Sequence, residues 1–127
     1  MQIIKDFLTE NKFDKHIDVT RRHSISDTIK DGDSCGIYIL DFSDGEYYVG
    51  QAVDVRRRFL QHKKNFDDIV AVHFRQVDKQ NLDIVEREMI AKLELIAKIR
   101  NIQYASIPDV SNSDLDELIP REAQYAA

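Results

Sequence analysis

Two short blocks in the first half of the chain each combine a tyrosine with a glycine: Gly36-Ile37-Tyr38 and, nine residues later, Tyr48-Val49-Gly50. Ten residues beyond the second tyrosine stands Arg58, then His62, and much later a single acid, Glu86, among apolar residues. Hydrolysis of a phosphodiester bond requires a base for water, a cation for the phosphate and often a metal-binding carboxylate. Together the phenols, the guanidinium, the imidazole and the carboxylate indicate a nuclease.

Arg58 and His62 lie on a predicted helix that Asp54 can N-cap and that extends to about Lys64. The apolar stripe of this helix consists of Val55, Phe59 and Phe66. At about 100° per residue, Arg58 and His62 flank or fall within this stripe, so both are held against the buried side. In the alternative interpretation, Arg58 extends along the core edge and His62 is an ordinary boundary histidine.

Glu86 lies on the apolar side of the longest periodic segment, a predicted helix from Gln80 to about Arg100. The stripe of this helix consists of Leu82, Val85, Met89, Ile90, Leu93 and Ile96. A carboxylate on a core face is costly unless it is paired, protonated or bound to a metal. Glu86 is therefore a candidate metal ligand or one partner of a structural ion pair with Arg58.

Both tyrosine blocks lie on predicted strands. Gly36–Phe42 and Glu46–Gly50 flank an Asp-Gly hairpin signal, and Ile69–Val77 has the β-branched character of a third strand. Alternation places Tyr47 opposite Tyr48, which indicates a packing role for Tyr47. Tyr38 and Tyr48 could instead simply be strand aromatics with their hydroxyls at the sheet edge. Gly50 indicates a tight strand exit or a close backbone approach to a ligand.

Three regions are expected along the 127 residues. Residues 1–34 contain a short amphipathic helix over 3–13 and a polar, turn-rich connector over 14–34. Residues 35–104 form the catalytic core, and residues 105–127 form an acidic tail. A 43% hydrophobic chain of this length can bury one modest core.

Cysteine content and hydropathy point to the cytoplasm. The single cysteine, Cys35, excludes an internal disulfide framework and indicates a reducing compartment. No apolar run approaches the roughly 20 residues of a membrane span, and charges appear too early for a signal peptide. We therefore expect a cytoplasmic protein with no membrane association.

The charged residues are unevenly distributed along the chain. The net charge of −5 argues against strong, indiscriminate binding of nucleic acid. However, residues 109–127 carry five acids and one base, and 17 Lys and Arg against 18 Asp and Glu remain elsewhere. Residues 55–64 carry five bases and no acid. Besides Arg58, these are Arg56, Arg57, Lys63 and Lys64, which with Gly50 are the expected substrate-binding residues. The alternative is that the basic residues of this segment only form a solvated helix face.

In this combination, the sequence resembles the GIY-YIG endonuclease family of intron-homing endonucleases, some restriction enzymes and the incision subunit of bacterial excision repair. Gly36-Ile37-Tyr38 matches the first signature of the family and Tyr48-Val49-Gly50 the second. Residues 51–62 match the helix-entry segment in register, and residues 82–86 resemble the segment with the metal-binding glutamate. The resemblance runs from about Gly36 to Asn101.

This resemblance implies a small α/β (α+β) domain with a three-stranded, mostly antiparallel sheet flanked by helices. It also implies hydrolysis of DNA that depends on Mg²⁺ or Mn²⁺. Tyr38 would be the general base, assisted by His62, and Tyr48 would orient water or phosphate. Arg58 would stabilise the phosphate, and Glu86 would be the only protein ligand of the metal.

Some points stay open at this stage. By position alone, Asn101 corresponds to a late asparagine of the family. The rival interpretation is a non-cleaving module of the same fold that binds nucleic acid or protein. Because an acidic chain carries little groove-reading surface, specificity could come from an additional DNA-recognition domain or a protein partner. The sequence does not indicate the oligomeric state.

Overall fold

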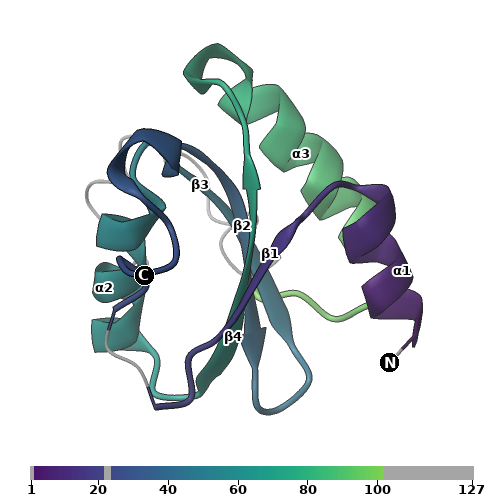
Figure 1. Ribbon diagram of the computed structural model, residues 1–127. Coiled ribbons are helices and arrows are strands. Elements are labelled where there is room, and N and C mark those ends of the chain that lie inside the picture. Colours follow the sequence, from purple (N-terminus) through teal and green to yellow (C-terminus); the bar gives the residue numbers. More distant parts are fainter. Residues whose placement is uncertain (1, 22–23, 102–127) are drawn as a thin grey trace.

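A single four-stranded antiparallel sheet organises the protein, whose computed structural model describes residues 2–21 and 24–101. The strand order is β1-β4-β2-β3 (Figure 1). In chain order the elements are α1 (Gln2–Glu10), β1 (Lys15–Asp18), η1 (Asp31–Asp33), β2 (Gly36–Phe42), β3 (Tyr47–Ala52), α2 (Val55–Asn65), β4 (Ile69–Gln76), η2 (Lys79–Asn81) and α3 (Leu82–Leu93). Within the described ranges, no helix is long and apolar enough to cross a membrane.

The sheet separates two hydrophobic cores. Helix α2 covers one face, while α1 and α3 cover the other (Figure 1). Successive strand residues point to opposite faces, so Tyr38 and Leu40 pack on the α2 side and Ile37 and Ile39 on the other. The strands thus supply both cores at once, and a side chain's position along the strand decides which helix it meets.

The sheet has four strands, so the expectation of three is wrong. The additional strand, β1, lies within the predicted connector over residues 14–34 and pairs with β4. It is only four residues long, and Ile17 is its one buried side chain. Such a segment is too short to show the alternation of apolar and polar residues that predicts a strand, so its pairing with β4 decides its structure. Residues after it also reach the core: Val19, Ile25 and Ile29 are buried.

Both terminal helices are shorter than predicted. Helix α1 ends at Glu10 because Lys12 adopts a φ of 66° and the chain reverses, which buries Phe13. Helix α3 ends at Leu93, and residues 98–101 run instead beside β3. There the Tyr47 amide donates to the Lys98 carbonyl at 3.0 Å, and the Arg100 amide donates to the Tyr47 carbonyl at 2.7 Å. Pairing with a sheet edge thus replaces the last turns of the predicted helix.

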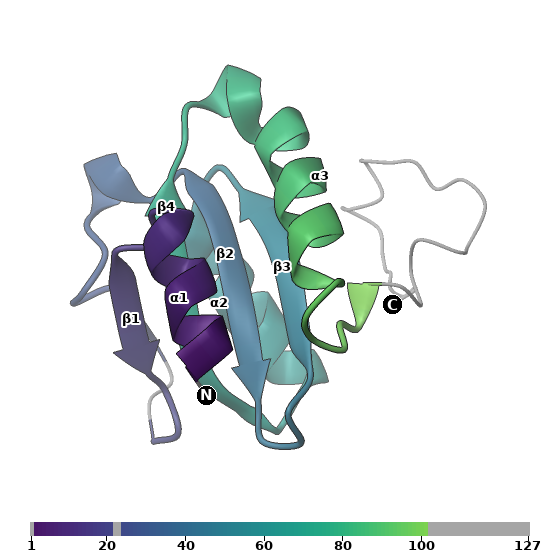
Figure 2. The same ribbon diagram turned by 90° about the vertical axis from the view of Figure 1, so that its right-hand side faces the viewer.

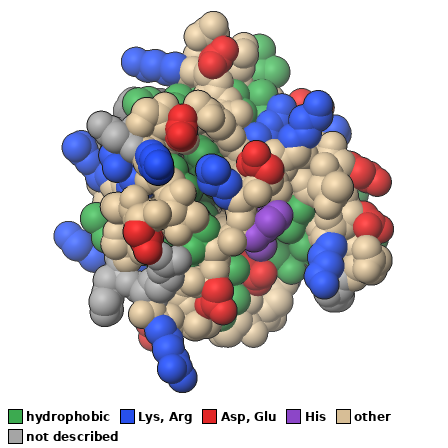
Figure 3. All heavy atoms as spheres, in the orientation of Figure 1, with side chains coloured by type: hydrophobic (Ala, Val, Ile, Leu, Met, Phe, Trp, Pro, Cys, Tyr) green, Lys and Arg blue, Asp and Glu red, His purple; other side chains and the backbone are tan. Residues whose placement is uncertain are grey.

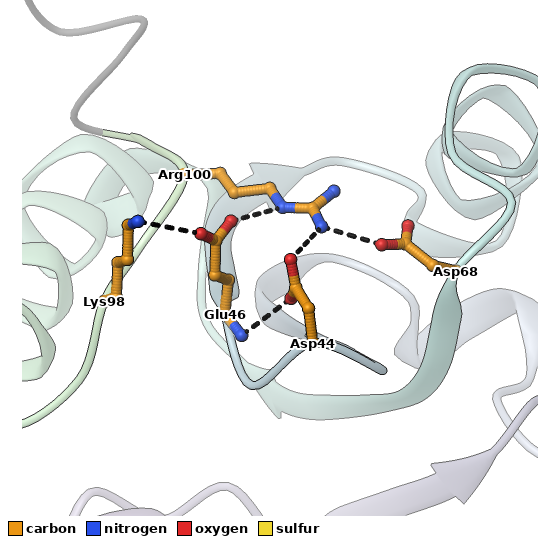
Figure 4. A network of polar contacts seen from close by, with 5 residues as sticks. All are labelled: Asp44, Glu46, Asp68, Lys98 and Arg100. Carbon is orange, nitrogen blue, oxygen red and sulfur yellow. Dashed lines mark hydrogen bonds and ion pairs between the residues drawn. The ribbon is translucent and has the colours of Figure 1, made fainter.

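Arg100 secures this edge segment through three carboxylates (Figure 4). Its guanidinium donates to Glu46 at 2.9 Å, Asp44 at 3.2 Å and Asp68 at 2.7 Å, and it lies 3.5 Å above the centre of the Phe42 ring. The Arg100 side chain is only 14% exposed, which makes these contacts stronger than those of a solvated arginine. The network ties the β2–β3 hairpin, the start of β4 and the segment after α3 together.

Helix α2 begins where the sequence predicts. The Asp54 carboxylate accepts the Arg56 amide at 3.1 Å and the Arg56 Nε at 3.1 Å. The hydrogen bonds from the Arg56 side chain and amide lower the pKa of Asp54. The helix then extends to Asn65, with Val55 and Phe59 buried beneath it.

We expect Asp54→Ala to lower the free energy of unfolding by about 1 kcal/mol, as measured by urea denaturation at neutral pH. Because folding lowers the pKa of Asp54, its stabilising effect is complete above the unfolded-state pKa. The effect is lost as the pH falls through the lower folded-state pKa. Asp54→Asn keeps an acceptor and should lose less. Equal stability of Asp54→Ala and the wild type would contradict the stabilising role of Asp54 as the N-cap of α2.

Candidate active site

The phenol of Tyr38 and the imidazole of His62 meet between β2 and α2. The Tyr38 hydroxyl lies 2.7 Å from His62 Nε2, and which group donates depends on the histidine tautomer. Tyr38 is 1% exposed, whereas His62 is half-buried. The imidazole is therefore the more accessible member of the pair.

Tyr48 lies beside this pair on the same face of the sheet. Its ring contacts the His62 ring edge-on, with centroids 5.2 Å apart, and lies 6.3 Å from the Tyr38 ring. Tyr47, the next residue back, packs against the core on the opposite face, as strand alternation predicts. The three rings of Tyr38, Tyr48 and His62 thus form one aromatic cluster under α2.

Gly50 makes room for the Tyr38 ring. It lies directly opposite Tyr38 in the β2–β3 register. A Cβ at this position would lie 2.3 Å from both the ζ carbon and the hydroxyl of Tyr38. The sequence predicts a tight strand exit or a close approach to a ligand, whereas the structure brings Gly50 close to the catalytic candidate Tyr38. Only glycine, which has no Cβ, leaves enough space for the Tyr38 side chain to cross β3 at this position.

The basic residues of α2 have different surroundings. Arg58 is half-buried and precedes His62 by one helical turn, so the two lie on one side of the helix. Arg57 and Lys64 are exposed, and Lys63 is half-buried. The Arg56 side chain binds the N-cap residue of the helix: its Nε and Nη2 donate to Asp54 at 3.1 and 3.2 Å.

Glu86 approaches from the other face of the sheet, on α3. It is half-buried, and its Oε1 accepts a hydrogen bond of 2.8 Å from Gln51 Nε2. Gln51 directly follows Gly50 on β3, which is one of the two edge strands of the sheet. The aromatic cluster and the carboxylate therefore reach the same stretch of one edge strand from opposite faces. Both helices and β3 are visible in Figure 1.

Residues 34–98 match the family model of the GIY-YIG catalytic domain, which covers more than half of the chain. The chain belongs to the GIY-YIG family. This membership identifies it as a phosphodiesterase nuclease that acts on nucleic acid, in a family whose enzymes typically use a divalent metal. No curated protein and no solved structure matches the chain.

Two further residues that the sequence analysis did not select lie at the candidate site. Gln51 Nε2 donates to Asp83 Oδ1 at 2.7 Å as well as to Glu86, so one amide group connects two carboxylates. Asp83 is exposed and precedes Glu86 by three residues on α3. The i,i+3 spacing of Asp83 and Glu86 could have identified Asp83 as a neighbour of Glu86 from the sequence. No local pattern marks Gln51, which reaches them only through the fold.

Asn101 binds the protein's own backbone. Its side chain is buried, accepts from the Val49 amide at 2.7 Å and donates to the Val49 carbonyl at 2.6 Å. Both backbone groups of Val49 face outward from the edge of the sheet, and this amide satisfies them as a neighbouring strand would. The contact positions β3 immediately before Gly50, which indicates that Asn101 has a structural role beside the candidate site.

The residues around Glu86 fit a divalent ion of the Mg²⁺ type. Asp83 and Glu86 offer carboxylate oxygens, the donors that Mg²⁺ prefers. Across residues 2–21 and 24–101, no cluster of three or more His, Cys, Asp and Glu side chains could enclose a metal. Mg²⁺ does not require such a cage, because it keeps several waters and takes further oxygens from substrate phosphates.

Proposed function

We propose that this protein is a divalent-metal-dependent endonuclease that hydrolyses phosphodiester bonds of DNA. The observation that carries the proposal is the 2.7 Å contact of Tyr38 with His62. Tyr38 lies opposite Gly50 on the edge strand β3, and the residue after Gly50, Gln51, binds Glu86. A base, a phosphate-binding cation and a metal ligand are the groups that this reaction requires. The family match supports nuclease chemistry in general, and the DNA substrate is part of the proposal.

Tyr38 acts in this proposal as the general base, assisted by His62. A phenol has a pKa near 10 in water and is a poor base at neutral pH without a neighbour that takes its proton. His62 Nε2 lies within hydrogen-bond distance of the phenol oxygen and is less buried than Tyr38. The proton of Tyr38 can therefore move to the imidazole and from there toward solvent.

Tyr48 and the basic side chains of α2 position the substrate. Tyr48 contacts the His62 ring and orients water or a phosphate oxygen. Arg58 stabilises the charge that develops on the phosphate, because a guanidinium presents several donors in a fixed plane. Arg57, Lys63 and Lys64 lie on the same helix and contact the backbone of the nucleic acid without selecting its sequence.

Glu86 is the proposed protein ligand of the metal, Mg²⁺ or Mn²⁺. Asp83 contributes nearby negative charge, and the Gln51 amide holds both carboxylates. When bound, such an ion polarises the phosphoryl group and stabilises the leaving oxygen. The role of Gln51 is then to orient the Glu86 carboxylate toward the substrate side of β3.

A nicking assay on supercoiled plasmid tests the proposal. At low salt, the wild-type protein should convert plasmid to open circle with Mg²⁺ or Mn²⁺ and should not do so with EDTA. Branched and single-stranded DNA extend the test to other substrates. If the protein binds these DNAs but cuts none of them, the rival non-cleaving module is favoured. The net charge of −5 is the observation that favours this rival.

Arg58→Ala should lower kcat by roughly 100- to 1000-fold, as expected when a preorganised donor to the developing charge is lost. Arg57→Ala is the matched comparison on the same helix, because Arg57 is exposed. It should raise KM and leave kcat nearly unchanged, since it contacts only the DNA backbone. Steady-state cleavage of a short fluorescent duplex separates the two effects. Equal losses in kcat would contradict the assigned role of Arg58.

A further inference from the structure

A polar cluster lies on the face of the sheet opposite the aromatic cluster, toward the β1 edge. His16 on β1 and His73 on β4 are directly opposite each other, and their Nδ1 atoms are 2.9 Å apart. On the other side of His73, the Asp41 Oδ2 lies 3.6 Å from its Nε2. These three residues come from three neighbouring strands, and the function proposed above uses none of them.

The Asp41 carboxylate determines the tautomer of His73. Its Nε2 is buried and has no hydrogen-bond partner within the described residues, and the nearest anionic group is the Asp41 carboxylate. A proton on Nε2 faces this carboxylate favourably, whereas a lone pair there would be repelled. The lone pair of His73 is therefore on Nδ1, and it points at His16. This is the arrangement of a metal-binding histidine with a carboxylate behind it.

The remaining geometry also suits a cation. In a tetrahedral site, two ligand nitrogens at roughly 2.05 Å from a Zn²⁺ ion lie about 3.3 Å apart. The two Nδ1 atoms are 2.9 Å apart, so the pair has to open by only a few tenths of an ångström to hold the ion. Asp18 lies on the same face as His16, and the register places Asp18 and Asp41 on either side of the small Ala71. Two carboxylates thus make this part of the sheet attractive to a positive ion.

The cluster is open to solvent on one side. His16 is exposed, and the β1 strand lies beside α1 and not behind it (Figure 2). A histidine side chain reaches the surface in the view of Figure 3, with carboxylate groups near it.

We propose that His16 and His73 bind one transition-metal ion, of which Zn²⁺ is the test case, through their Nδ1 atoms. The ion replaces the single hydrogen between the two nitrogens, and that hydrogen moves to Nε2 of His16 when its tautomer changes. The Asp41 carboxylate stays beside His73 Nε2, 3.6 Å away, as a charge partner of the site, and water completes the coordination. Imidazole ligands select Zn²⁺, Ni²⁺ or Cu²⁺ over Mg²⁺, so this site differs in kind from the oxygen site at Glu86.

Isothermal titration of ZnCl₂ into the untagged full chain tests this proposal. We expect one saturable site per chain and no competition by excess Mg²⁺. Binding should be lost in His16→Gln, which alters an exposed side chain and should leave the fold intact. Asp41→Asn should weaken binding by several-fold, since it removes the negative charge beside His73. Glu10→Gln, an exposed acid at the end of α1, is the control and should bind normally.

NMR of the histidine ring nitrogens provides a second readout. On addition of Zn²⁺, the Nδ1 resonances of His16 and His73 should shift and those of His62 should not. Absence of saturable binding would show that the histidine pair is only a hydrogen bond and would overturn the proposal. Binding that persists in both His16→Gln and His73→Gln, or that disappears in Glu86→Ala, would also overturn it.

Discussion

Glu86→Ala should reduce metal-dependent cleavage by about 1000-fold or more while the protein stays folded. The carboxylate is the proposed protein ligand of the metal, and losing the ion removes several kcal/mol of transition-state stabilisation. The fold should tolerate the change because Glu86 is only half-buried, and Gln51 retains Asp83 as an acceptor. Plasmid nicking at several Mg²⁺ concentrations, together with thermal unfolding, measures both effects.

Glu88→Ala is the matched control on the same helix. Glu88 is exposed, and its ion pair with Lys92 at 3.2 Å is an i,i+4 surface contact. Such a pair contributes about 0.5 kcal/mol or less, so activity and stability should both stay near the wild-type values. If Glu86→Ala cut DNA as well as Glu88→Ala does, the metal assignment would be wrong.

Gly50→Ala should reduce cleavage by roughly 100-fold or more through the displacement of Tyr38. The new methyl group would lie 2.3 Å from the ζ carbon and hydroxyl of Tyr38, a separation that no folded protein retains. Tyr38 is fully buried and cannot swing into solvent, so its ring must shift away from His62. A displacement of this kind removes the proton acceptor from the general base.

Two comparisons isolate this effect. Gly32→Ala adds the same methyl group where no atom lies within 4 Å, and it should be fully active. In the double variant Gly50→Ala/Tyr38→Phe, cleavage should fall little below that of Tyr38→Phe alone, because both changes disable the same group. If Gly50→Ala retained wild-type activity with a normal fold, the Tyr38–His62 contact would not matter for catalysis.

Local patterns were sufficient for several elements. The N-cap Asp54 and the buried Val55 and Phe59 predict α2, and the structure confirms the helix over Val55–Asn65. The Asp-Gly signal predicts the hairpin, where Gly45 adopts a φ of 89°. These features depend on neighbours within one turn or one strand pair, so residue order alone carries them.

Other features depended on partners distant in sequence. Strand β1 shows no period of its own and exists because β4 pairs with it. The end of α3 is set by residues 98–101, which satisfy the outer edge of β3. Gln51 has no distinguishing local pattern, although it connects the two carboxylates of α3. The acidic tail over 105–127 lies outside the described residues, as do residues 102–104 of the predicted core.

By itself, the sequence determined the GIY-YIG family, the set of candidate residues and the helix and strands that carry most of them. Only the tertiary structure decided which of these residues meet. Tyr38 and His62 are 24 residues apart, Gln51 and Glu86 are 35 apart, and His16 and His73 are 57 apart. Periodicity and capping act over a few residues, whereas these contacts follow from strand register and helix packing, to which segments from the whole domain contribute.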